Sequence, residues 1–139
     1  MAMSDYDFSS SNLSVAPAPY ALPPYHYKNN EMFTVIVKTD ADVLRALVPE
    51  PMVPNDENKL VIYIGWLHIE QPKAITYGEA GIMIPVSLGD RTGTYMPILY
   101  LDEMETLLSG REVWGFPKFR GEIAFERNET SVAASVISD

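Results

Sequence analysis

The chain contains no cysteine, so it can hold neither a disulfide framework nor a metal ion bound through thiolates. It has only two histidines, His26 and His68, and their separation does not match that of paired metal ligands. The carboxylates likewise form no acidic cluster with a recognisable metal-binding loop. We therefore expect neither a metal ion nor any other cofactor.

Positive charge is also scarce. The 139 residues include 10 Lys and Arg against 19 Asp and Glu, which gives a net charge of −9 at pH 7. A nucleic-acid backbone or an anionic membrane would repel such a chain. No apolar run approaches the ~18 residues of a membrane-spanning helix, and no basic segment leads into the apolar run of a secretory signal. These absences favour a cytoplasmic protein with neither a nucleic-acid nor a membrane partner.

The residues that are present suffice for one domain. A hydrophobic fraction of 47% can supply a packed core in a chain of this length. Residues 1–24 are rich in Ser, Ala and Pro and show no hydrophobic period, which predicts a flexible N-terminal arm. That arm could alternatively lie against a neighbouring subunit. Residues 25–139 are expected to form the folded part.

The secondary structure is expected to consist mainly of strands. Segments rich in β-branched and aromatic residues predict strands at residues 33–39, 59–68, 82–88, 94–101, 121–126 and 131–137. Two short helices are predicted, one over 40–48 and one beginning at Asp102. Because helices and strands do not alternate, the fold class is mostly β (α+β), with a mainly antiparallel sheet.

Glycines and prolines suggest where these elements are interrupted. Tyr77–Gly81 is expected to be a turn, and residues 89–93 are expected to connect a hairpin. Pro85 and Pro97 lie inside predicted strands and should occupy bulges or edges, because proline donates no ladder hydrogen bond. In the second helix, Asp102 is the expected N-cap and Gly110 the expected terminator.

One stretch, Gly110–Phe119, has an unusual lysine. Lys118 follows a proline, lies between two phenylalanines and has a tryptophan four residues before it. Large apolar neighbours penalise a charged amine, so the pKa of Lys118 should fall below its ordinary value of about 10.4. A neutral lysine on a rigid turn can attack a ketone. The alternative is an ordinary surface lysine beside an aromatic turn.

Eight segments along the chain bear on this choice: Pro24-Tyr25 with Asn29 and Glu31, Lys38-Thr39-Asp40, Val48-Pro49-Glu50-Pro51, Tyr77-Gly78-Glu79, Ile84-Pro85-Val86-Ser87, Tyr100-Leu101-Asp102, Gly110-Arg111-Glu112 and Gly115-Phe116-Pro117-Lys118. In this order they resemble the acetoacetate decarboxylase family, whose members use a lysine Schiff base. The resemblance implies a closed, cone-like antiparallel β-barrel with short peripheral helices, assembled into homo-oligomers. Family members are longer, so it also implies that residues 25–139 are the N-terminal part of a single domain whose C-terminal half is absent.

Site residues follow from the resemblance position by position. Lys118 matches the Schiff-base lysine and Glu79 a pocket glutamate, which makes these two the catalytic candidates. Two positions depart from the decarboxylases proper, because Phe119 replaces a second lysine and Asn30 replaces a pocket arginine. We expect Phe119 and Asn30 to contact substrate together with Arg120, Phe116 and Trp114.

Three functions remain open. The first is a lyase that decarboxylates a small β-keto acid through an iminium and an enamine on Lys118. The second is an aldolase- or dehydratase-like enzyme that forms the same Schiff base with pyruvate or another α-keto acid, which the loss of two cations favours. The third is a non-catalytic β-barrel that binds a small ligand.

Overall fold

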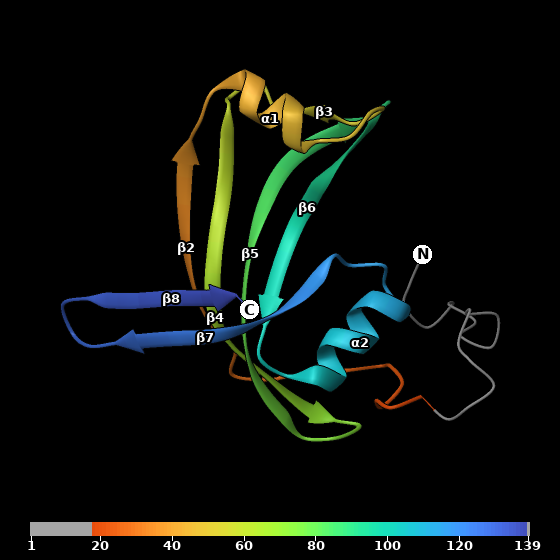
Figure 1. Cartoon of the computed structure of the whole chain (residues 1–139), viewed down its shortest axis with the longest axis vertical. Helices are drawn as coiled ribbons and strands as arrows, with labels where there is room; N and C mark the ends of the chain where they lie inside the picture. The colour runs from red at the N-terminus through yellow and green to blue at the C-terminus, as the bar shows by residue number, and fades with distance from the viewer. Residues whose placement is uncertain (1–17, 139) are drawn as a thin grey trace.

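The computed structural model describes residues 18–138, which form a strand-dominated fold with two short helices (Figure 1). Neither described helix is long or apolar enough to cross a membrane. The elements follow in chain order: β1 His26–Tyr27, β2 Glu31–Lys38, α1 Ala41–Leu47, β3 Val53–Pro54, β4 Lys59–Gln71, β5 Ile75–Leu88, β6 Arg91–Leu101, α2 Met104–Glu112, β7 Lys118–Arg127 and β8 Val132–Ser138.

The eight strands form one sheet around a meander of β4, β5 and β6. Both β1 and β2 pair with β4, and β3 pairs with β5. On the other side β7 joins β6, and β8 returns antiparallel to β7. The strand-rich fold class is confirmed.

Closure of the sheet into a barrel is not seen in residues 18–138. Along the hydrogen-bonded path the sheet runs from β1 to β8, and these two strands do not pair with each other. The β6–β7 pairing is parallel rather than antiparallel, because α2 carries the chain back before β7 begins. Instead of closing the sheet, the β7–β8 hairpin lies across it (Figure 1).

The hairpin is fixed in that position by packing and charge. Ile123 of β7 packs with Ile64 of β4 and Ala80 of β5 in a small buried cluster. At the far end of β7, Arg127 Nη1 lies 2.9 Å from Glu31 Oε1 of β2. The hairpin therefore covers one face of the sheet.

The prediction of a turn at Tyr77–Gly81 is wrong, because these residues lie inside β5. Glycine signals a turn in the sequence, but here it allows close packing. A Cβ at Gly78 would lie 2.6 Å from Cβ of Ile123, and one at Gly81 would lie 2.9 Å from the ring of Tyr63. The glycines let β7 and a tyrosine ring approach β5.

Other local predictions had mixed outcomes. Pro97 lies in an irregularity between β5 and β6, as expected. The hairpin is confirmed, but only residues 89 and 90 connect its strands, because β6 begins at Arg91. The N-cap of α2 is Glu103, whose side chain accepts a hydrogen bond from Thr106 N, so the assignment to Asp102 is wrong by one residue. Gly110 does not end the helix but lies within it.

The described part of the expected arm contacts the body of the chain. Residues 1–17 lie outside the described residues. Tyr20 is buried, and its hydroxyl donates to Glu112 Oε2 of α2 at 2.6 Å. Helix α2 is thus held from the N-terminal side, at the opposite end of the sheet from α1 (Figure 1).

Candidate active site

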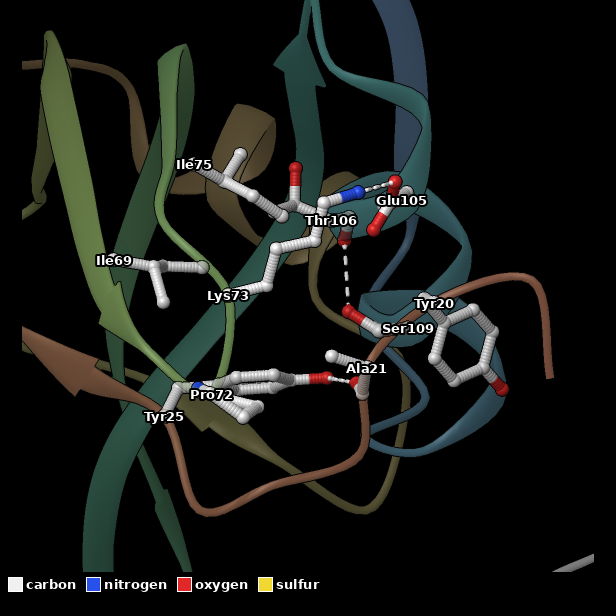
Figure 2. Close-up of a pocket in the computed structure, with 10 residues that line it drawn as sticks. All are labelled: Tyr20, Ala21, Tyr25, Ile69, Pro72, Lys73, Ile75, Glu105, Thr106 and Ser109. Atoms are coloured by element: carbon white, nitrogen blue, oxygen red, sulfur yellow. Dashed lines mark hydrogen bonds and ion pairs between the residues drawn. The ribbon is translucent and has the colours of Figure 1, made fainter.

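A pocket of about 380 Å³ opens between the sheet and α2. Its wall combines residues of β1, β4, β5, α2 and the segment that leads into β7: Tyr25, Tyr27, Ile69, Tyr77, Thr106, Ser109, Gly110, Trp114, Phe116 and Lys118. A much narrower hollow adjoins it and shares Tyr25, Ile69, Thr106 and Ser109 (Figure 2). Figure 2 also shows Tyr20 and Ala21 beside α2, where the N-terminal segment closes that hollow.

Lys118 is the first residue of β7, and its side chain enters the pocket. It is 8% exposed, which is unusual for a lysine. Its Nζ lies 3.0 Å from Glu79 Oε2, 3.5 Å from the carbonyl oxygen of Thr106 and 5.8 Å from the centre of the Tyr77 ring. The backbone is held from both sides, because Arg111 Nη1 donates to the Lys118 carbonyl and Leu99 N donates to that of Pro117.

Glu79 is the acidic partner, and it is also 8% exposed. Its Oε1 accepts a hydrogen bond of 2.9 Å from the hydroxyl of Tyr63. Its Oε2 accepts no hydrogen bond of favourable geometry from the described residues and is compensated by the nearby lysine amine. Tyr63 therefore binds Oε1 of Glu79, and Oε2 is left to face the amine of Lys118.

Lys118 and Glu79 form a close pair of opposite charge, and each residue is only 8% exposed. The sequence interpretation weighed the apolar neighbours of Lys118 and the replacement of a second lysine by Phe119. The structure brings the carboxylate of Glu79, already a catalytic candidate from the resemblance, into direct contact with the lysine amine.

Gly110 of α2 makes room for the lysine. A Cβ at this position would lie 2.6 Å from Lys118 Cε and 3.0 Å from its Nζ. The helix therefore presents a bare backbone surface where the lysine stem passes.

Two buried tyrosines surround the carboxylate. Burial, together with the Glu79 charge, raises the pKa of Tyr63 and that of Tyr77 far above the ordinary value of a phenol. Both hydroxyls therefore stay protonated near neutral pH. The Tyr77 hydroxyl lies 3.4 Å from that of Tyr27, which leaves a pair of phenols at the pocket wall.

The structure brings four of the seven expected site residues together. Lys118, Glu79, Trp114 and Phe116 lie at or beside the pocket. The aromatic pair is partly exposed, with 38% and 40% of the side chains accessible, so it covers the pocket from one side only.

The other three lie outside the lining of this pocket, and their contacts with substrate stay predictions. Phe119 points to the opposite face, where it packs near Tyr100 and lies under the guanidinium of Arg111. Asn30 accepts a hydrogen bond from the backbone N–H of His68. Arg120 is exposed because pairing of β7 with β6 ends there, although alternation places it on the same face as Lys118.

Sequence reasoning missed Tyr63, Tyr77 and Gly110. Tyr63 reaches Glu79 only through the β4–β5 register, which pairs it with Gly81, two residues along from Glu79. Gly110 was interpreted as a helix stop because glycine often ends helices. The sequence shows only that Gly110 precedes Lys118 by eight residues. The contact between them depends on how the chain turns from α2 into β7, which the sequence does not show.

Fold and site together define a β-rich protein with a buried lysine–glutamate pair in an aromatic-walled pocket. The family model described as acetoacetate decarboxylase (ADC) matches residues 13–139. The chain belongs to the acetoacetate decarboxylase family.

Curated relatives agree with this assignment. The chain is 40% identical over 113 residues to the acetoacetate decarboxylase of Ralstonia nicotianae, covering 81% of this chain and 43% of that protein. It is 38% identical over 106 residues to the enzyme of the same name from Clostridium botulinum, covering 76% and 42%. The chain therefore spans less than half the length of these relatives.

Solved structures share the fold. A structure described as acetoacetate decarboxylase superposes with a TM-score of 0.77 at 28% identity, covering 98% of this chain and 55% of that one. The enduracididine biosynthesis enzyme MppR, complexed with the condensation product of pyruvate and imidazole 4-carboxaldehyde, superposes with a TM-score of 0.68 at 21% identity, covering 80% and 45%. The second likeness supports the fold alone.

Proposed function

We propose that the protein is a Schiff-base-forming lyase that decarboxylates a keto acid bound to Lys118. The observation that carries this proposal is the 3.0 Å approach of Lys118 Nζ and Glu79 Oε2 at a pocket wall, in a member of the acetoacetate decarboxylase family. A nucleophilic amine next to a proton acceptor is the arrangement that imine formation requires.

The reaction begins with a proton transfer from the Lys118 ammonium to Glu79. The neutral amine then adds to the ketone carbon, and the carbinolamine loses water to give an iminium ion. Glu79 returns the proton that the departing hydroxyl needs. Tyr63 keeps the carboxylate oriented throughout, because its hydroxyl remains a donor to Oε1.

The iminium then accepts the electron pair released when the bond to the carboxyl carbon breaks. Carbon dioxide leaves and an enamine remains. Protonation of the enamine carbon regenerates an iminium, and water hydrolyses it to the product ketone and free lysine. Protons and electrons balance without a cofactor.

A second outcome of the same Schiff base is aldol or dehydration chemistry on an α-keto acid. The departures from the decarboxylase charge pattern at Phe119 and Asn30 suggest it, and among the described residues Lys118 is the only cationic side chain in the pocket wall. The homo-oligomeric, cytoplasmic protein expected from the sequence remains a prediction.

Borohydride trapping tests the proposal. The chain is incubated with acetoacetate or pyruvate at pH 7, reduced with borohydride and digested for mass mapping. We expect the reduced adduct on Lys118 and none in Lys118→Met. The matched control is Lys73→Met, which removes an exposed lysine paired with Glu105 and should trap as the unmodified chain does.

The product analysis separates the alternatives. Carbon dioxide from acetoacetate supports the decarboxylase. An adduct with pyruvate without carbon dioxide release from acetoacetate would favour the aldolase-like function. If neither ketone modifies Lys118 in a folded chain, decarboxylation of a small keto acid on Lys118 is ruled out and the proposal fails.

A further inference from the structure

The pocket at Lys118 is larger than a small keto acid needs. Its volume of about 380 Å³ lies in the range of cavities that enclose drug-sized ligands. Besides the reacting carbonyl and the carboxylate, pyruvate carries only a methyl group, and acetoacetate carries a methyl and a methylene group. The described pocket therefore has room for a ligand with an additional substituent.

The wall indicates the chemistry of that substituent. Aromatic rings line the pocket from two sides: Tyr25, Tyr27 and Tyr77 from the β1 and β5 side, and Trp114 and Phe116 from the segment before β7. Such faces favour stacked or edge-on contact with another ring.

Most polar groups of the wall are engaged within the protein. The Tyr25 hydroxyl donates to the carbonyl of Ala21, and the hydroxyls of Tyr27 and Tyr77 face each other at 3.4 Å. The hydroxyl of Thr106 donates to the carbonyl of Glu103, and that of Ser109 donates to the carbonyl of Thr106. Glu79 stands beside the lysine and would repel a second carboxylate nearby. Arg111 is engaged by the Lys118 carbonyl and the Phe119 ring.

We propose that the pocket selects ketones that bear an aryl group, with the ring held between Phe116 and the tyrosines of β1 and β5 while the carbonyl faces Lys118. This inference rests on the Schiff-base function proposed above and specifies its substrate class. Imine formation on such a ketone releases one water and needs no further reactant.

A matched pair of neutral methyl ketones tests the inference in the full chain. 4-Phenyl-2-butanone and 2-butanone differ by one phenyl group and lack a carboxylate. Each is titrated with the protein before borohydride reduction, and the concentration for half-maximal modification of Lys118 is measured. We expect at least a ten-fold lower value for the phenyl ketone. Equal values, or a lower value for 2-butanone, would overturn the inference and leave the Schiff-base proposal standing.

Two variants locate the effect. Phe116→Ala should raise the half-maximal concentration for the phenyl ketone at least five-fold more than that for 2-butanone. Phe33→Ala, on β2, is the control, because Phe33 is also 40% exposed but lies outside the pocket. An equal effect of both variants would contradict the assigned ring site.

Equilibrium dialysis separates failure of the chemistry from failure of the inference. Saturable binding of 4-phenyl-2-butanone that is at least ten-fold tighter than that of 2-butanone, without any adduct, would overturn the Schiff base and support the aryl site. Absence of both binding and adduct would overturn both proposals.

Discussion

At the scale of single residues, the site depends as much on a missing side chain as on those present. Gly110 has no Cβ, and the stem of Lys118 occupies the space that one would need. The atoms in the way are the far end of a flexible side chain, so a larger residue would displace the amine before it disturbed the fold. The glycine is thus a positioning residue for the amine.

Gly110→Ala should therefore separate function from stability. We expect adduct formation on Lys118 to fall at least ten-fold because the amine is pushed away from Glu79. The free energy of unfolding should change by no more than about 1 kcal/mol, since alanine is the better helix former by a similar amount. Both are measured on one preparation, by borohydride trapping and by urea unfolding.

Gly93→Ala provides the control, because a Cβ at Gly93 meets nothing within 4 Å. Its trapping should match that of the unmodified chain. Normal trapping in Gly110→Ala would contradict the positioning role.

At the scale of strands and helices, register creates the site. Tyr63 of β4 pairs with Gly81 of β5, Gly81 with Leu99 of β6, and Leu99 with Lys118 of β7, so one row crosses four strands. Glu79 lies in the next row on the same face. Residues 55 positions apart in sequence are brought onto one line by hydrogen bonding between backbones.

Register also explains how far the sequence could predict the site. The sequence pointed to Lys118 as a candidate nucleophile because its neighbours in sequence are large and apolar. It pointed to Glu79 through the resemblance to the family. The strands were found because their β-branched composition is local. Tyr63, the opposite orientation of Phe119 and the exposure of Arg120 depend on pairings between distant strands, which no local pattern contains.

The hydrogen bond that links β5 to the connection between β6 and α2 gives a prediction at this scale. Asp102 Oδ1 accepts a hydrogen bond of 2.9 Å from Gly78 N, next to Glu79 and just beyond the last β6 residue. Asp102→Ala leaves that partly buried N–H without this acceptor, so we expect a loss of about 1–3 kcal/mol in the free energy of unfolding. Asp90→Ala, in the exposed hairpin connection, is the control and should cost under about 0.5 kcal/mol. Equal effects in urea unfolding would show that the Asp102 contact adds nothing.

At the scale of the whole molecule, buried phenols make stability depend on pH. The pKa values of Tyr63 and Tyr77 are raised in the folded state by burial and by Glu79, while the unfolded chain keeps ordinary phenols near pKa 10. As pH rises above about 10, the unfolded state therefore releases protons that the folded state retains. The stabilisation is fully present below that pH and declines above it.

Unfolding in urea at pH 8, 9, 10 and 11 measures this decline. Each of the two tyrosines should contribute a slope of up to about 1.4 kcal/mol per pH unit above pH 10. Tyr63→Phe and Tyr77→Phe should each flatten the slope, with little effect on the difference between pH 8 and pH 9. A slope that both variants leave unchanged would assign the alkaline loss to other groups.

The row that ends at Lys118 also has a consequence for the order of folding. The β5–β6 hairpin closes through a tight local turn, so it can form early at little entropic cost. β7 can join β6 only after α2 has reversed the chain, and Tyr20 meets Glu112 across 92 residues of sequence. We therefore expect the lysine and the carboxylate to meet only when β7 docks on a sheet that already holds the carboxylate. Until that docking the sheet carries the acid without its base, and the pocket acquires its chemistry with β7.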